Sequence, residues 1–141
     1  RYIDSLSRES SSSASSAPST ASWRGRAIQD EPVTQSNRRG TLTFAAGGPN
    51  TRTVQLFINL RDNARLDAMG FAPVGEVLAG MDAVDALHTG YGEGAPSGKG
   101  PSQGSITAQG EAYLAREFPL LDQIRSARVV RYWPAGAPPA R

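Results

Sequence analysis

The apolar residues of this chain lie in short segments. These segments are separated by turns rich in glycine, proline and asparagine. In 41–45, Leu42 and Phe44 alternate with threonines, a period of two that is typical of a strand with one buried face. A dense turn signal follows at 47–50, and the largely apolar segment 54–60 then predicts a second, more deeply buried strand. Segments of this length and pattern favour short strands, and we therefore expect a mainly β fold.

The second half of the chain adds helical patterns to the strands. Pro73 must lie at the start or the edge of any strand, because proline has no N–H for the ladder. Met81, Val84 and Leu87 recur at the spacing of one helix face. The expected elements are a strand at 72–77, a short helix at 80–88, an irregular glycine-rich stretch at 90–110, a second helix at 111–118 and a last strand at 124–132.

Composition excludes several classes of site. The chain has no cysteine and one histidine, His88, which excludes disulfides, thiolate zinc sites and multi-histidine metal sites, so no metal is expected. A triad of serine and histidine stays formally possible. The 15 Lys and Arg residues against 13 Asp and Glu make a weak case for nucleic acid, and none is expected as a partner. No run of about 18 apolar residues occurs, so no membrane span is expected.

The first 22 residues form a separate compositional zone, in which ten residues are serine. So little apolar surface cannot offset the entropy of ordering, which predicts a linker at 1–22. The alternative is the remnant of an organellar leader, although Asp4 and Glu9 count against it. The length of 141 residues suits one domain, which we expect at 23–133, followed by a flexible tail at 134–141.

A set of short blocks over roughly fifty positions resembles the second half of the cyclophilins, the peptidyl-prolyl cis-trans isomerases. The blocks are GTLTFA at 40–45, GPNT at 48–51, QLFINL at 55–60, GFA at 70–72, GEV at 75–77 and GMD at 80–82. The resemblance implies an antiparallel barrel, here partial, with about four strands and two short helices. Blocks at 90–94 and 118–122 also resemble a C-terminal extension seen in some members.

The resemblance implies an enzyme that isomerises X-Pro bonds of peptides and proteins during folding and needs no cofactor. Rotation about a peptide bond crosses a barrier of about 18 to 20 kcal/mol, because the bond has partial double-bond character. An apolar proline pocket, a backbone rail and a donor aimed at the prolyl nitrogen would together stabilise the twisted bond. By resemblance, Phe57, Leu66 and Phe71 line the pocket, Ala45 and Ala46 form the rail, Gly47 leaves the next substrate position open, and Gln55 bonds the substrate backbone.

Several of these assignments have plainer alternatives. Phe57 could be an ordinary core aromatic, and Gln55 an outward-facing strand residue. Family members carry an arginine followed by a Phe-Met-x-Gln motif; Arg1 lies near the expected spacing, but the motif is absent. Where many members have tryptophan this chain has Arg65, which suggests altered preference for cyclosporin-like macrocycles. A second hypothesis is therefore an inactive cyclophilin-like module, whose open barrel edge a protein partner would cover.

Overall fold

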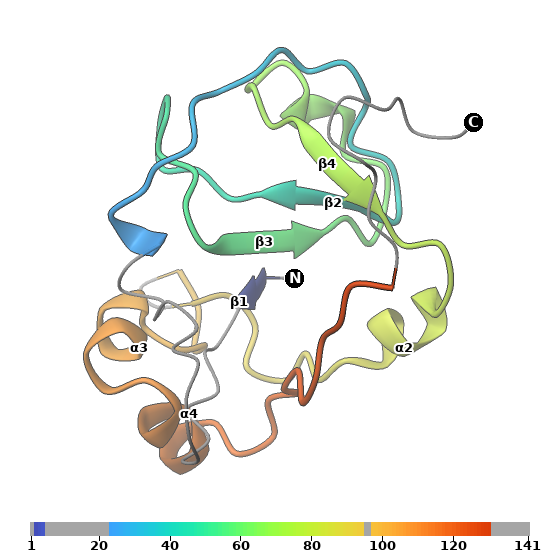
Figure 1. Ribbon diagram of the computed structural model, residues 1–141. Helices are drawn as coiled ribbons and strands as arrows, with labels where there is room; N and C mark the ends of the chain where they lie inside the picture. Colours follow the sequence, from blue (N-terminus) through green and yellow to red (C-terminus); the bar gives the residue numbers. More distant parts are fainter. Residues whose placement is uncertain (1, 5–22, 95–96, 131–141) are drawn as a thin grey trace.

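The computed structural model describes residues 2–4, 23–94 and 97–130, and a four-stranded antiparallel sheet lies at its centre (Figure 1). The order of the strands is β1-β3-β2-β4, so β1 and β4 form the two edges. The described residues therefore form an open sheet, and the partial barrel that we expected is not confirmed among them. The strands are β1 (Tyr2–Asp4), β2 (Thr41–Phe44), β3 (Gln55–Ile58) and β4 (Pro73–Glu76).

The two central strands form where the sequence alternates. β2 and β3 pair antiparallel with Thr43 opposite Phe57, which confirms the predicted strands at 41–45 and 54–60 with slightly shorter ends. The connection at 45–54 turns at Asn50, whose φ of 56° is a left-handed conformation that asparagine tolerates. Pro73 begins β4 and lies on a sheet edge, as expected for a residue without an N–H.

Besides the helical residues 23–24, the described part of the chain holds three α-helices and one 3-10 helix rather than two helices. They are η1 (Ala64–Leu66), α2 (Met81–Ala86), α3 (Gln103–Gln109) and α4 (Glu111–Glu117). The predicted helices at 80–88 and 111–118 correspond to α2 and α4, and both are confirmed. These α-helices contain more residues than the four strands, so a mainly β barrel is not confirmed for this part of the chain.

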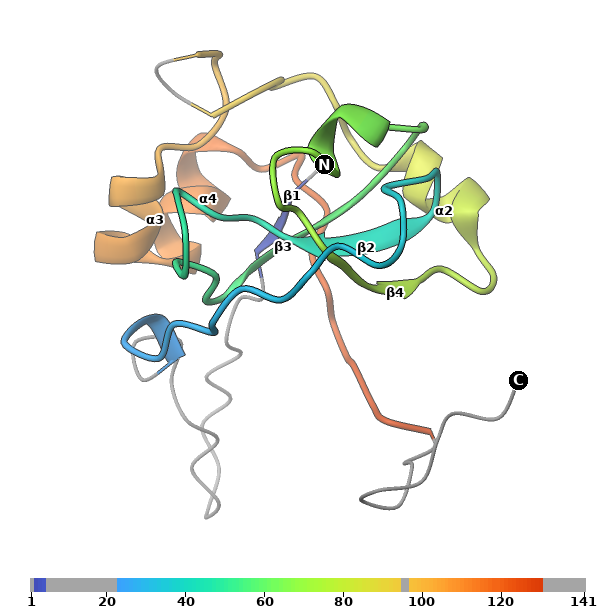
Figure 2. The same cartoon turned by 90° about the horizontal axis from the view of Figure 1, so that it is seen from above.

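The irregular stretch predicted at 90–110 is wrong where it includes α3. The Ser102 side chain caps this helix by accepting a bond from the Ser105 N–H, and Ile106 is buried. Capping and burial thus compensate for Gly104 inside the helix. Figures 1 and 2 both show α3 and α4 together at one side of the molecule and α2 at the other.

The last predicted strand, at 124–132, is also wrong over its described residues. Residues 121–130 have no regular structure, and Val129 and Val130 are 61% and 86% exposed. Figure 2 shows this segment leading away from the sheet. Valine favours a strand only where a partner strand and a packed face are present, and no strand of residues 2–4, 23–94 or 97–130 pairs with these two exposed valines.

The N-terminal zone predicted as a linker begins with a strand. Tyr2–Asp4 forms β1 and pairs with β3, so the linker expectation is wrong for these residues. Residues 5–22 and the predicted tail at 134–141 lie outside the described residues. No helix in the described part of the chain is both long and apolar enough to cross a membrane.

Candidate active site

Three of the predicted site residues line one pocket of about 490 Å³. Phe57 comes from β3, Leu66 from η1, and Phe71 from the loop that precedes β4. The Phe57 and Phe71 rings meet edge to face, with centroids 6.1 Å apart and planes at 67°. All three side chains are half-buried, so they present apolar surface that an incoming apolar ring could cover.

Charged residues surround this apolar floor. Arg61, Arg65 and Glu93 all line the pocket, and all three are exposed. Arg61 and Arg65 form no ion pair within the described residues. The pocket therefore combines an aromatic floor with positive charge on its 61–65 side.

A buried hydrogen-bond network holds the loop that carries Leu66 and Phe71. Asn37 is 0% exposed, and its Nδ2 donates to the Phe71 carbonyl at 2.7 Å and to the Asp67 carboxylate at 2.8 Å. The Asn37 N–H donates a further bond to Asp67 at 2.9 Å. A residue 34 positions earlier thus fixes the backbone of Phe71.

The same network reaches the sheet through the other side of Asn37. Its Oδ1 accepts from the Thr43 hydroxyl on β2 at 2.9 Å and from Asn59 Nδ2 at 3.1 Å. Asn59 lines the pocket, and its Oδ1 accepts a 2.7 Å bond from Asn63, another lining residue. Sequence reasoning missed this network, because no local pattern links residue 37 to residues 59 and 71. The network became visible only when the structure showed that the polar residues Asn37, Thr43 and Asn59 are buried.

Asp67 is the acidic member of this network. It accepts a 2.5 Å bond from the Ser36 hydroxyl, in addition to those from Asn37. Hydrogen bonds from Ser36 and then from Asn37 lower the pKa of Asp67, because they stabilise the carboxylate form. The charged carboxylate is therefore the form that orders the start of the 67–71 loop.

Comparison with known proteins identifies a family for this chain. The model of the family described as "Cyclophilin type peptidyl-prolyl cis-trans isomerase/CLD" matches residues 4–108. The chain belongs to this family. A "Peptidyl-prolyl cis-trans isomerase" of Acinetobacter baylyi is 44% identical over 57 residues, which is 37% of this chain and 30% of that protein. The match thus spans less than a third of that relative's length.

The rail predicted in this cyclophilin domain is the first part of the 45–54 loop. The Ala45 N–H donates to the Gln55 carbonyl at 2.9 Å, which closes the base of the loop. Ala45 and Ala46 are half-buried, and Gly47 is exposed with its N–H bonded to the Thr51 hydroxyl at 2.9 Å. A Cβ on Gly47 would meet only that hydroxyl, at 4.0 Å, so the space beside it is open. Ala45, Ala46 and Gly47 do not line the aromatic pocket itself.

Gln55 and Arg1 are the remaining predicted site residues. Gln55 begins β3, and its Nε2 donates to the Oε1 of Gln103 on α3 at 2.5 Å. It does not line the pocket, although the two-residue repeat of a strand puts it on the same face as Phe57. Arg1 lies outside the described residues, and the strand after it begins with Tyr2 opposite Phe57. No group of three metal-binding side chains occurs in the described ranges.

Proposed function

We propose that this cyclophilin domain catalyses cis-trans isomerisation of X-Pro bonds in peptides and proteins without a cofactor. The observation that carries the proposal is the meeting of Phe57, Leu66 and Phe71 around one pocket. The family match and the partial relative support it. Neither of them supports the alternative of an inactive interaction module.

The pocket suits the proline ring because the ring is apolar and rigid. Burial of the ring against Phe57 and Phe71 anchors one side of the X-Pro bond. The rail at Ala45 and Ala46 holds the peptide backbone beyond the bond, and the acyl carbonyl turns relative to the anchored proline ring. Gln55, through its amide, is proposed to hydrogen-bond the peptide backbone next to the rail.

Catalysis requires stronger binding of the twisted bond than of either planar form. As the bond twists, the prolyl nitrogen gains lone-pair character and accepts a hydrogen bond, which an arginine side chain supplies well. Arg1 is proposed for this role, because β1 brings the start of the chain beside β3 and its Phe57. No bond is made or broken, so no cofactor has a task.

A protein partner over an open sheet edge stays part of the proposal. The edge strand β4 leaves Val74 48% exposed, and Leu78 just after it is 88% exposed. Such an edge can pair with a strand of another chain. Light scattering during gel filtration tests the case in which the partner is a second copy of the chain, because a single species with the mass of one chain would contradict self-association through the edge.

The deciding experiment measures isomerisation by NMR exchange on a short X-Pro peptide. The uncatalysed reaction takes about 10 to 100 s, so exchange on a much shorter time scale demonstrates catalysis. An Arg1→Ala variant tests the donor: it should bind the peptide but turn it over more slowly. Binding without any acceleration by the unmodified chain would contradict the enzymatic proposal.

A further inference from the structure

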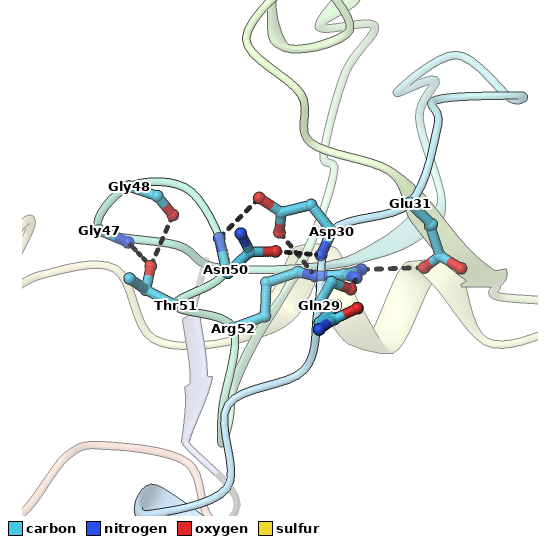
Figure 3. A network of polar contacts seen from close by, with 8 residues as sticks. All are labelled: Gln29, Asp30, Glu31, Gly47, Gly48, Asn50, Thr51 and Arg52. Atoms are coloured by element: carbon cyan, nitrogen blue, oxygen red, sulfur yellow. Dashed lines mark hydrogen bonds and ion pairs between the residues drawn. The ribbon is translucent and has the colours of Figure 1, made fainter.

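The 45–54 loop, which carries the proposed rail, is tied to a segment that touches neither the pocket nor the rail. That segment is 28–31, and the Ile28 N–H donates to the Arg52 carbonyl at 2.8 Å as an isolated antiparallel bridge. Figure 3 shows the polar contacts that join the two segments. The inference below rests on the proposed function, because it concerns how the peptide is held.

Arg52 is the centre of this contact. Its side chain is 4% exposed, and it pairs with Glu31 at 2.9 Å and with Asp30 at 3.2 Å (Figure 3). One terminal nitrogen also donates to the Gln29 carbonyl. The Nε has no hydrogen bond, so its contact with Asp30 is Coulombic. Removal of one of these partners would leave the buried guanidinium charge of Arg52 less well paired, and an unpaired buried charge strongly destabilises a fold.

Asp30 also fixes the loop through Asn50, by two reciprocal hydrogen bonds. The Asp30 N–H donates to Asn50 Oδ1 at 2.8 Å, and the Asn50 N–H donates to Asp30 Oδ2 at 2.7 Å. Asn50 is the residue with φ of 56°, so these bonds hold the loop at its left-handed non-glycine residue. One carboxylate therefore serves both Arg52 and the turn.

The turn continues directly into the rail. The Thr51 hydroxyl accepts from the Gly47 N–H at 2.9 Å and donates to the Gly48 carbonyl at 2.7 Å. A chain of contacts thus runs from Asp30 through Asn50 and Thr51 to Gly47, next to Ala46 (Figure 3). A shift of the turn would move the backbone that the peptide is proposed to use.

We propose that Asp30 and Arg52 are positioning residues of the substrate-binding loop. They hold residues 45–47 in the geometry that the peptide backbone requires, and they do not touch the peptide. A loop fixed before binding loses less conformational entropy when the peptide binds. Peptide affinity therefore depends on two residues outside the pocket and the rail.

The test compares Asp30→Ala with Asp85→Ala. Asp85 forms the exposed ion pair with Arg39 at 2.6 Å, so Asp85→Ala also removes a surface carboxylate from an ion pair, but on α2. We expect the dissociation constant of a proline peptide to rise on the order of tenfold in Asp30→Ala, which corresponds to about 1.4 kcal/mol. Asp85→Ala should change it by less than about twofold, since exposed ion pairs contribute little.

Two further measurements separate positioning from a general loss of stability. Amide hydrogen exchange at 46–48 should accelerate in Asp30→Ala and not in Asp85→Ala, at a temperature where circular dichroism shows both variants folded. Asn50→Gly keeps the positive φ but removes the side chain, so its effect on affinity should not add to that of Asp30→Ala. Fully additive effects would contradict a shared role of this pair.

The outcomes also distinguish this inference from the proposed function. If the unmodified chain neither binds nor isomerises a proline peptide, the proposed function is wrong and the positioning role falls with it. If the unmodified chain does both and Asp30→Ala binds equally well, only the positioning role is overturned. Weaker binding with faster exchange at 46–48, in Asp30→Ala alone, supports it.

Discussion

The side-chain amide of Asn37 donates a 2.7 Å hydrogen bond to the backbone carbonyl of Phe71. Asn37 is fully buried, and it also bonds Asp67 and accepts from Thr43 and Asn59. One amide group thus joins the loop behind the pocket to the central sheet. The position of the Phe71 ring depends on a side chain that never reaches the pocket.

Asn37→Ala should therefore destabilise the fold and weaken peptide binding together. Loss of the amide leaves buried partners unsatisfied, and we expect unfolding to become easier by about 2 to 4 kcal/mol. Asn63→Ala is the control, because it removes a single bond, to Asn59, and should cost about 1 kcal/mol. Urea unfolding followed by circular dichroism measures both, and equal losses would contradict a central role for Asn37.

Acid should destabilise the protein through Asp67. Its pKa is lowered in the folded state by bonds from Ser36 and Asn37, so its stabilising contribution is present above the ordinary aspartate pKa of about 3.9. That contribution is lost as the pH falls through the lower folded value. The unfolding temperature of Asp67→Asn should therefore depend less on pH below about pH 4 than that of the unmodified chain. Parallel curves for the two proteins would show that Asp67 is not responsible.

Phe57→Ala should lower peptide affinity far more than its effect on stability explains. Phe118→Ala is the matched control, since Phe118 is also half-buried but packs against Tyr91 and Tyr113 rather than in the pocket. Each truncation should cost up to about 3 kcal/mol of stability. NMR titration with a proline peptide, at a temperature where both variants are folded, should show weakened binding in Phe57→Ala alone. Unchanged affinity in a folded Phe57→Ala would refute the pocket assignment of Phe57, Leu66 and Phe71.

Arg65 should give the pocket a preference for acidic peptides. Arg61 and Arg65 line it without ion pairs in the described ranges, and Glu93 is the one acidic lining residue. A peptide with glutamate beside its proline should bind about two- to fivefold more tightly than one with lysine. Arg65→Glu should reverse the order, and about 0.5 M salt should weaken it. Arg128→Glu, exposed in the terminal segment, should leave the order unchanged.

Sequence pattern predicted correctly the elements that form because of interactions between residues close in sequence. The alternation at 41–45 and the helix face at 80–88 are local signals, and β2 and α2 follow them. Pro73 likewise lies at a strand start and edge because of its own chemistry. Phe57, Leu66 and Phe71 were joined in one pocket only by resemblance, since periodicity cannot relate a strand to a later loop.

Where the sequence pattern predicted the wrong secondary structure, the presence or absence of contacts with residues distant in sequence determined the structure that formed. Burial of Ile106 and the cap at Ser102 made α3 a helix in a glycine-rich stretch. Val129 and Val130 lie outside any strand, because none of the strands in the described ranges pairs with them.

By itself, the sequence determined the short central strands, two of the helices, the family, and the exclusion of cysteine and multi-histidine chemistry. Only the tertiary structure decided that the described sheet is open and that Asn37 orders the Phe71 loop. It alone also showed that Asp30 pairs with Arg52 and exchanges two hydrogen bonds with Asn50 in the 45–54 loop. The physical reason is that hydrogen bonds and ion pairs depend on distance in space, whereas a sequence pattern records only the preferences of neighbouring residues.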